Sequence, residues 1–515
     1  MQQPSDMRVT RILWAAAILL LGFVMAWPAI GGMIAVNDDI KFVRVPAHGE
    51  PVAKQIVDAW RNSPSFRPLE LMVAAGCDER TLACPIAIVV QMAGLALLAW
   101  GVAALARMVM PGQPWVAPIA LLWIVMSPGT TCAAWQIDAG SQTWSAALGT
   151  WACVLCWQGF QAARAGRVAW GSLATLTLVF ALGVNIKETF YGWSAGIGVV
   201  AIAATLWLFV RDRAAALRAA PTLMPVVALP IAHLAARWFT GAVSQSAEAN
   251  QDSRYQVELG MNLVINAVQS VAGAVGTGPF YLLADEKAPL ALRALPALAG
   301  LVELCLLAAA VEFAVLRPAR EKRLRWMPVA LACVAGMISL SVTFPMGSVS
   351  ELYGFGANVM IALLVGVALT ALWRAVEVED RGLTRTVAMV GGATALMVGL
   401  YGLAGRAHHF RNIWLCTRTA NEQIVAFMDT RPEAPKYGDA PISTIYFPSS
   451  CRPERSYGSY IMPVAQAVDI LNTVDWMARL HPRHPTTFSV DTDAPNHGPY
   501  DAVVGCDAMP RDGHW

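Results

Sequence analysis

The residues best suited to chemistry begin with two adjacent carboxylates, Asp38 and Asp39, which directly follow an apolar segment. Adjacent carboxylates at a membrane boundary are costly unless they are solvated, paired or functional. One interpretation is a solvated end of the apolar segment. Another is a general base, because an ionised carboxylate can take the proton from an acceptor hydroxyl. A divalent ion held by both carboxylates is a third interpretation.

Two cations have residue types and neighbours that suit a phosphate group. Arg67 precedes Pro68, which favours an extended backbone at Arg67, and its guanidinium stays charged and matches phosphate oxygens. Lys187 supplies a point charge between two apolar segments, and the adjacent Glu188 can hold it in place. The alternative for Lys187 and Glu188 is a simple ion pair at the membrane interface.

Other polar residues at segment ends are candidates for substrate binding. Asp138 and Gln142 are four residues apart, so one helical face could direct both into the same cavity, although Asp138 could instead cap the helix. Glu351 and Tyr353 could bind sugar hydroxyls or belong to an aromatic belt at the membrane interface. Arg254 is a weaker candidate for phosphate binding.

Composition indicates what must position these residues. Hydrophobic residues make up 56% of the 515-residue chain and charged residues 14%, whereas soluble domains carry about 25% charge. This predicts an integral membrane protein. The formal net charge is only +2, so the chain lacks the excess of positive charge that binds a polyanion. No nucleic-acid partner is therefore expected.

Eleven apolar segments are long enough to cross a membrane as helices, since about 20 residues suffice. They lie near 12–36, 82–106, 115–131, 142–163, 168–186, 191–210, 219–240, 289–316, 326–345, 354–375 and 385–404. Basic residues between them mark the cytoplasmic side: Arg8, Arg11, Arg164, Arg167, Arg211, Arg213, Arg218, the cluster 317–325, Arg374, Arg381 and Arg385. All of these basic residues lie on the same side of the membrane only if the segment 256–283 does not cross it. This predicts a cytoplasmic N-terminus and an extracytoplasmic C-terminus.

The predicted fold class is an all-α polytopic membrane protein with a small extracytoplasmic α+β domain. The membrane domain is expected over 1–404, with a catalytic outer loop at 37–81, and the soluble domain over 405–515. In the second domain we expect a helix at 412–429, another near 463–480 and a strand at 443–447.

Five cysteines lie on the predicted outer side, where an oxidising compartment would allow those of the tail to form a disulfide. Cys77 and Cys84 flank the start of the second apolar segment on that side. In the tail, Cys416 and Cys451 are expected to pair, with Cys506 as the alternative partner of either.

Four of these motifs, in this order, resemble a known enzyme family. Asp38-Asp39-Ile40, a Trp and Phe66-Arg67-Pro68-Leu69 resemble the first luminal loop of multi-span GT-C glycosyltransferases. The order continues with Pro128, Trp135 and Asp138, then Lys187-Glu188, then Glu351 and Tyr353. The resemblance covers about 12–420. It is strongest to O-mannosyltransferases with tetratricopeptide repeats and to their bacterial relatives, although this tail contains no such repeat.

The resemblance implies a polyprenyl-phosphate-linked sugar as the donor and a glycan, lipid or protein as the acceptor. Asp38 would be the base, and Asp39 its neighbour or a group that positions the acceptor. Arg67 and Lys187 would face the donor phosphate, which lies at the outer membrane surface. No cofactor or metal is required by this arrangement, and a divalent cation is the alternative. The expected location is the bacterial plasma membrane.

Two other functions are compatible with a multi-span chain. A transporter or flippase for an envelope lipid or glycan precursor would often show two related halves with broken helices at the midplane. No halves match here, and the polar candidates gather on one side. A non-catalytic membrane scaffold is the other alternative.

Overall fold

The computed structural model describes residues 4–36, 43, 51–62, 68–137, 139–240, 260–261, 263–264, 266–267, 303, 305, 325–341, 344, 354–379, 382–429, 443–446, 488–491 and 502–503. Their main elements are α1 (Pro4–Gly31), α3 (Val52–Asn62), α4 (Pro68–Ala74), α5 (Pro85–Val109), α6 (Val116–Met126), α7 (Pro128–Ala134), α8 (Gly140–Arg164), α9 (Trp170–Ile186), α10 (Phe190–Arg211), α11 (Arg213–Ala219), α12 (Leu229–Phe239), α18 (Trp326–Ser341), α19 (Phe355–Glu379) and α20 (Gly382–Asp429). Between α11 and α12 lie a 3₁₀ turn, η1 (Ala220–Thr222), and a π turn, η2 (Met224–Ala228).

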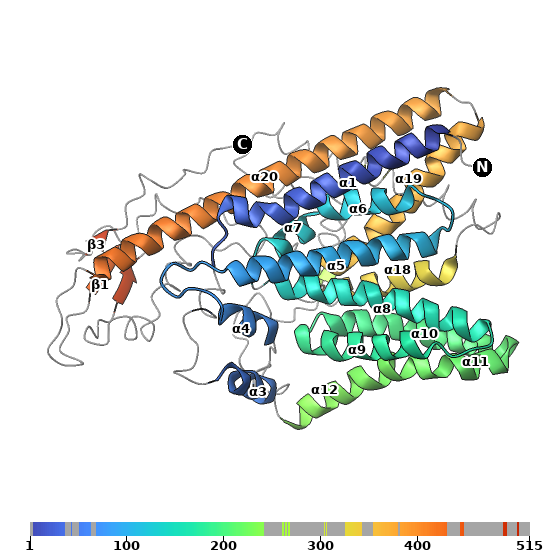
Figure 1. Ribbon diagram of the computed structural model, residues 1–515, viewed down its shortest axis with the longest axis horizontal. Coiled ribbons are helices and arrows are strands. Elements are labelled where there is room, and N and C mark those ends of the chain that lie inside the picture. Colours follow the sequence, from blue (N-terminus) through green and yellow to red (C-terminus); the bar gives the residue numbers. More distant parts are fainter. Residues whose placement is uncertain are drawn as a thin grey trace.

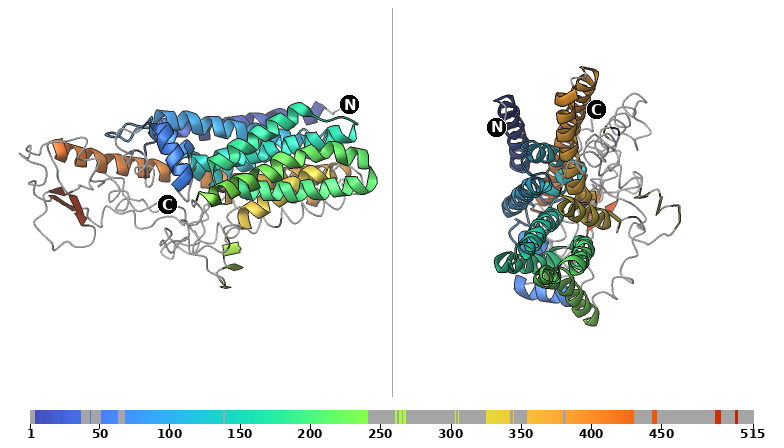
Figure 2. Two further views of the ribbon diagram at one scale, coloured as in Figure 1. Left: turned by 90° about the horizontal axis from the view of Figure 1, so that it is seen from below. Right: turned by 90° about the vertical axis from the view of Figure 1, so that its right-hand side faces the viewer.

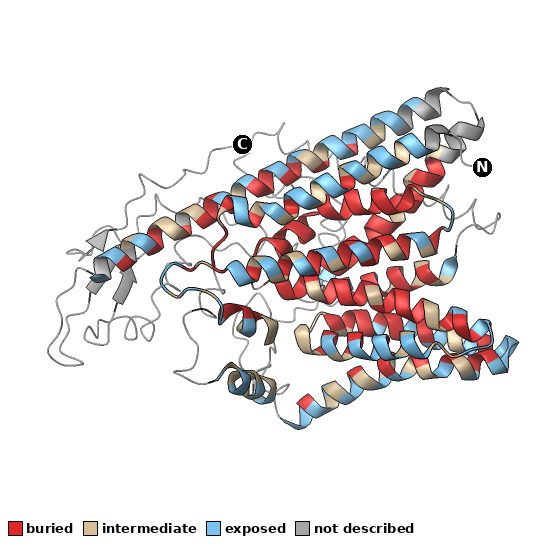
Figure 3. Cartoon of the chain, viewed as in Figure 1, coloured by how far each residue is buried: buried red, intermediate tan, exposed pale blue. Residues whose placement is uncertain are grey.

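The long helices run side by side as a bundle, while α3 and α4 lie across one end of it (Figure 1; Figure 2). The central helices α6, α7 and α8 are largely buried, whereas α1, α12 and the first half of α20 expose apolar side chains (Figure 3). Apolar side chains on the outside of a bundle are what a lipid environment requires. The chain is therefore an integral membrane protein.

Four described helices, α1, α5, α10 and α19, are long and apolar enough to cross a membrane. The number is six if α6 with α7, and α11–η1 with η2–α12, each count as one bent span. Helices also lie in the predicted segments 142–163, 168–186, 326–345 and 385–404, and the helix in the third of these ends at Ser341. Most of 289–316 and 256–283 lies outside the described residues, so the eleven-span topology stays a prediction.

The bend between α6 and α7 follows directly from the sequence Ser127-Pro128. Ser127 is extended (φ −68°, ψ 140°), and Pro128 has no N–H to continue the α6 hydrogen bonds, so the two helices meet at 65°. Ser127 Oγ donates to the carbonyl of Ile124 (2.8 Å), and Arg406 of α20 binds another backbone group at the bend. Its guanidinium donates to the carbonyl of Met126 and to Thr131 Oγ1 (2.8 Å). A buried break in a helix is stable when its backbone groups find such partners.

The helix α20 runs without a break through residue 404, the predicted domain boundary, and extends beyond the bundle (Figure 1). The end of α1 and the 77–84 loop pack along it. Trp27 Nε1 donates to the carbonyl of Ala407 (3.1 Å), and Asn421 Nδ2 donates to the carbonyl of Arg80 (2.7 Å). Arg80 also forms an ion pair with Asp429. The predicted helix 412–429 is thus the last part of α20.

A three-stranded parallel sheet follows, in the order β2 (Phe488–Asp491), β1 (Ser443–Tyr446), β3 (Ala502–Val503). Ser443 pairs with Phe488, and Ile445 pairs with Ala502. The predicted strand at 443–447 is confirmed as β1. The residues near 463–480, Cys451 and Cys506 lie outside the described residues, as does the side chain of Cys416. The separate soluble domain therefore stays a prediction.

Glycines allow the closest helix contacts, as the crossing of α10 and α18 shows. A Cβ added at Gly196 would lie 2.3 Å from Ala335 Cα, a backbone atom that cannot move alone. We expect Gly196→Ala to lower the free energy of unfolding by about 1–3 kcal/mol, measured by thermal denaturation in detergent. Gly22→Ala is the matched control because nothing lies within 4 Å of that position. Equal stability of the two variants would contradict this packing.

Candidate functional site

The centre of the site is a buried ion pair at the end of the bundle that carries α4. Lys187 Nζ lies 3.9 Å from Glu70 Oε1, and the two side chains are 4% and 2% exposed. Ser141 Oγ donates to the same carboxylate oxygen at 2.6 Å. Opposite charges and hydrogen bonds are what make a buried charge tolerable, since each ion loses its hydration. The Lys187 ammonium group is thus buried and paired at this end of the bundle.

Three separate elements bring this pair together. Glu70 lies in the first turn of α4, and Ser141 in the first turn of α8. Lys187 follows α9, in extended backbone (φ −160°, ψ 148°) within the short turn that leads into α10. The carbonyl of Lys187 accepts from the Phe190 N–H (3.0 Å), which closes this turn.

Gln142 connects α8 to the same turn. Its Oε1 accepts from Thr189 Oγ1 (2.9 Å), and Thr189 Oγ1 also lies 3.2 Å from Ser145 Oγ. Gln142 is 4% exposed, and its Nε2 has no hydrogen-bond partner among the described residues. A buried amide donor of this kind needs a partner such as an ordered water or a ligand.

The other predicted site residues, Asp38, Asp39, Arg67, Asp138, Arg254, Glu351 and Tyr353, lie outside the described residues. For four of them, the nearest described residues in the sequence lie at this end of the bundle (Figure 1). Val36 ends the α1 segment just before Asn37, and Pro68 begins α4 directly after Arg67. Gly140 begins α8 two residues after Asp138. The chain segments that carry four of these residues therefore start from the end of the bundle that holds Lys187.

Two details differ from the interpretation of the sequence. The helix α8 begins at Gly140 with Ala139, not Asp138, in the N-cap position. The sequence offers the adjacent Glu188 as a group that can hold Lys187 in place, and the structure places Glu70 Oε1 3.9 Å from Lys187 Nζ. The only local signal for Glu70 was a carboxylate in the first turn of a short, otherwise apolar helix.

A second polar cluster, which the sequence interpretation missed, holds α3 against the bundle. His233 of α12 contacts Tyr191 Oη through Nδ1 (2.6 Å) and Asn185 Oδ1 through Nε2 (3.0 Å). Trp60 Nε1 of α3 also lies 3.3 Å from His233 Nε2. A single ring nitrogen cannot both donate to Asn185 and accept from Trp60. Only one of these two contacts is therefore a hydrogen bond in a given tautomer of neutral His233.

A disulfide joins Cys77 and Cys84 in the loop before α5. Inside it, Asp78 accepts hydrogen bonds from the backbone N–H groups of Thr81 (2.7 Å) and Arg80 (2.9 Å). The bond from Thr81 is the main reason that the pKa of Asp78 is lowered. Disulfides are typical of oxidising compartments, which is consistent with an extracytoplasmic loop.

The expected outcome of removing this disulfide is a measurable loss of stability. Closing a loop of this size by a cross-link contributes about 2.5 kcal/mol in the chain-entropy description. We expect Cys77→Ser combined with Cys84→Ser to lower the free energy of unfolding by about that amount, measured by thermal denaturation without reductant. Cys333→Ser, at a half-buried free thiol, is the control. Unchanged melting of the double variant would show that the two thiols are not joined.

Among the described residues, no three His, Cys, Asp or Glu side chains come together as metal ligands. Asp38 and Asp39 lie outside that part of the chain, so a divalent ion at these two carboxylates stays an alternative.

Comparison with known proteins gives distant structural likenesses only. No protein-family model matches the chain, and no curated protein matches it. ArnT from Cupriavidus metallidurans, solved with bound undecaprenyl phosphate, is 12% identical with a TM-score of 0.49, covering 92% of this chain and 89% of ArnT.

The oligosaccharyltransferase AglB from Archaeoglobus fulgidus, solved with an inhibitory peptide and a dolichol-phosphate, is 11% identical with a TM-score of 0.42, covering 84% of this chain. The same archaeal enzyme with zinc and sulfate gives 12% identity and a TM-score of 0.41. This chain spans about three fifths of that enzyme's length. With TM-scores below 0.5, these likenesses say nothing about which residues of this chain act, or on what.

Proposed function

We propose that this protein is a membrane glycosyltransferase. It transfers a sugar from a polyprenyl-phosphate-linked donor to an acceptor hydroxyl on the extracytoplasmic side. The observation that carries the proposal is the buried Lys187–Glu70 pair, a cation kept in place at the end of an apolar bundle. In the sequence, Arg67 directly precedes the helix of Glu70, and Asp38 and Asp39 come two and three residues after Val36, the last described residue of the α1 segment. A lipid-linked phosphate at a membrane surface needs such an arrangement of charges.

The two cations have a defined task in this reaction. When the bond between the anomeric carbon and the phosphate oxygen breaks, negative charge develops on the departing polyprenyl phosphate. Lys187 and Arg67 stabilise that charge in a partly dehydrated site, where electrostatic interactions are strong. An ammonium group has three N–H donors, so Lys187 can serve both Glu70 and a phosphate oxygen. Glu70 is then a positioning residue that keeps Lys187 protonated and in place.

Asp38 acts on the other reactant. Its carboxylate takes the proton of the acceptor hydroxyl as the hydroxyl oxygen attacks the anomeric carbon, opposite the departing phosphate. The acceptor oxygen forms the new bond, the phosphate takes the electrons of the old one, and configuration at the anomeric carbon inverts. Asp39 positions the acceptor. Gln142, Asp138, Glu351 and Tyr353 bind sugar hydroxyls, with Glu188 and Arg254 at the margin of the donor site.

The test is a direct search for the product. Purified protein in vesicles is incubated with radiolabelled polyprenyl-phosphate sugars and an envelope extract, and the labelled product is identified by mass spectrometry. The expected result is transfer of label from lipid to an acceptor, with inversion at the anomeric carbon. Movement of intact labelled lipid between leaflets without any product would contradict the proposal and favour a flippase.

The proposed orientation has its own prediction. Arg61 at the end of α3 and Arg164 at the end of α8 are both exposed, at opposite ends of the bundle (Figure 1). We expect Arg61→Cys to react with a membrane-impermeant maleimide in intact cells, whereas Arg164→Cys reacts only after the membrane is opened. The control is the parent protein, which gives the background labelling. The reverse pattern would place the site on the cytoplasmic side.

A further inference from the structure

Trp60 connects the helix α3 to the end of the bundle. Its Nε1 lies 3.3 Å from His233 Nε2 of α12, and the two rings meet edge to face with their centres 6.2 Å apart. Both side chains are half-buried, and α3 lies beside α12 (Figure 1). Aromatic rings in this arrangement attract each other beyond the area that they bury. Trp60 is therefore a contact through which α3 is held on the bundle.

In the sequence, α3 stands between the segments that carry the predicted reacting residues. Asp38 and Asp39 precede it, and Arg67 follows its end by five positions. The helix after Arg67, α4, is attached to the bundle by Glu70. Five residues of chain span at most about 18 Å. Trp60 therefore sets one end of a short connection that contains Arg67, and Glu70 sets the other.

Asn185 of α9 competes with Trp60 for the same ring nitrogen. Its Oδ1 lies 3.0 Å from His233 Nε2, and its Nδ2 donates to the carbonyl of Ala181 (2.8 Å), which keeps the amide oxygen turned towards the ring. An amide oxygen can only accept a hydrogen bond, and an indole N–H can only donate one. Nε2 therefore donates to Asn185 when it carries the proton, and accepts from Trp60 when it does not.

Tyr191 serves both tautomers of the neutral ring. Its Oη lies 2.6 Å from His233 Nδ1, and a hydroxyl can donate to this nitrogen or accept from it. His233 thus makes two hydrogen bonds in either tautomer, and the two arrangements differ in whether Trp60 or Asn185 is bound. With equal numbers of hydrogen bonds, a small change at the ring decides which arrangement is formed.

We propose that His233 is a positioning residue, whose neutral ring holds α3 through Trp60 in one tautomer and releases it in the other. For the reaction, this inference rests on the proposed function: a held α3 keeps the segment of Arg67 where the donor phosphate binds. The apparent affinity for the donor is then reduced in proportion to the fraction of molecules that hold α3.

Hydrogen–deuterium exchange of the backbone amides of α3 measures how firmly the helix is held. It is followed by mass spectrometry on the purified protein. Trp60→Phe keeps an aromatic ring but removes the donor, and His233→Leu removes the acceptor. In both variants we expect exchange in α3 to be about fivefold faster, the effect of one neutral hydrogen bond.

Asn185→Leu gives the decisive comparison. It removes the competing acceptor and keeps a branched side chain, so Nε2 of His233 stays available to Trp60. Exchange in α3 should then be slower than in the parent protein. Loss of packing alone would make exchange faster in every variant of this cluster. Opposite effects of Asn185→Leu and His233→Leu therefore distinguish a choice between two partners from a structural contact.

Transfer kinetics supply a second readout. KM for the lipid-linked donor should rise about fivefold in Trp60→Phe with kcat unchanged, because a saturating donor restores the held arrangement. KM should not rise in Asn185→Leu. Damage to the reacting groups themselves would lower kcat instead.

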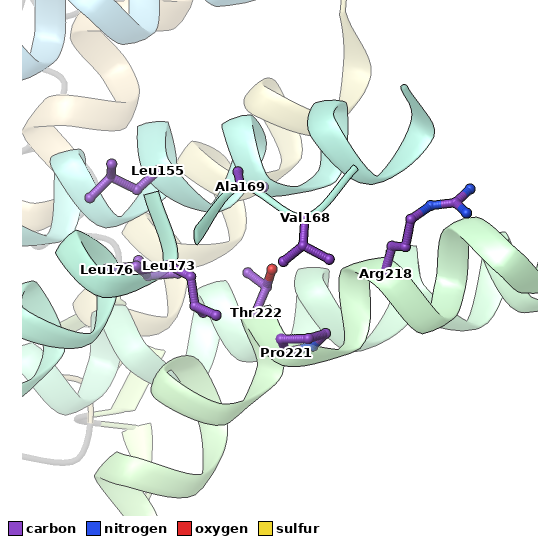
Figure 4. Close-up of a pocket in the computed structure, with 9 residues that line it drawn as sticks. Leu155, Val168, Ala169, Leu173, Leu176, Arg218, Pro221 and Thr222 are labelled. Atoms are coloured by element: carbon purple, nitrogen blue, oxygen red, sulfur yellow. The ribbon is translucent and has the colours of Figure 1, made fainter. Parts of the chain in front are cut away.

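Two controls remove similar contacts elsewhere. Trp115→Phe removes an indole donor whose partner is Thr10 Oγ1 (2.8 Å). Arg218→Gln removes the bond from Arg218 Nε to the carbonyl of Ala163 (3.0 Å). This bond lies at the other end of the bent span that contains α12, where Arg218 lines a small pocket beside Val168 (Figure 4). Neither control should change exchange in α3 or KM for the donor.

Three results would contradict different parts of this account. Unchanged exchange in Trp60→Phe and His233→Leu, or faster exchange in Asn185→Leu, would overturn the proposed role of His233. A donor KM that is the same in all variants would overturn its link to donor binding. A parent protein that transfers no sugar, while exchange in α3 follows the expectation, would contradict the proposed function alone, because exchange does not depend on activity.

Discussion

Replacement of Asp38 by Asn is expected to lower turnover by about 10²–10⁴-fold, because the variant keeps the size of the side chain but cannot accept the acceptor's proton. The affinity for the lipid-linked donor should change little, since Asp38 acts on the other reactant. Turnover and donor affinity are measured on purified protein whose melting temperature matches that of the parent.

Variants of the two cations distinguish the loss of a base from the loss of donor binding. Lys187→Ala and Arg67→Ala remove positive charge from the phosphate, so donor affinity and turnover should fall together. An Asp38→Asn protein that keeps more than about a tenth of parent turnover would exclude Asp38 as the base, because loss of a general base costs at least about 10²-fold. Asp39→Asn would then be the next variant to measure.

Replacement of Glu70 by Ala is expected to lower the free energy of unfolding by about 3–5 kcal/mol. The variant leaves the Lys187 ammonium buried without its carboxylate, and an uncompensated buried charge carries a cost of that size. Thermal denaturation in detergent measures the loss. The matched control is Arg80→Ala, which breaks the ion pair with Asp429. Those side chains are 44% and 42% exposed, so the expected loss is about 0–1 kcal/mol.

A double variant separates stability from chemistry. Glu70→Gln combined with Lys187→Met removes both charges at nearly constant volume, and such replacements of buried pairs are often neutral for stability. We expect melting to recover while turnover and donor affinity stay low, because the cation for the phosphate is gone. Recovery of turnover together with melting would show that the pair serves the fold alone.

Local chemistry in the sequence was enough to predict several features of this protein. The long apolar segments indicated a membrane bundle, since an apolar helix of about 20 residues is stable in lipid without any further partner. The strand at 443–447 was predicted in the same way, because Thr, Ile and Tyr are typical of strands. Each of these signals lies within a few residues of its effect.

Contacts between distant segments were decided by the tertiary structure. Lys187 lies next to Glu188 in sequence, yet the fold carries Glu70 on α4 to it, because burial requires a partner inside the same dry space. The carbonyl of Met126, freed by the break at Pro128, is bound by Arg406, 280 residues away. The sequence by itself determined which groups would need a partner. Only the packing of the helices determined which partner each one has, because desolvation and hydrogen bonding depend on distance in space.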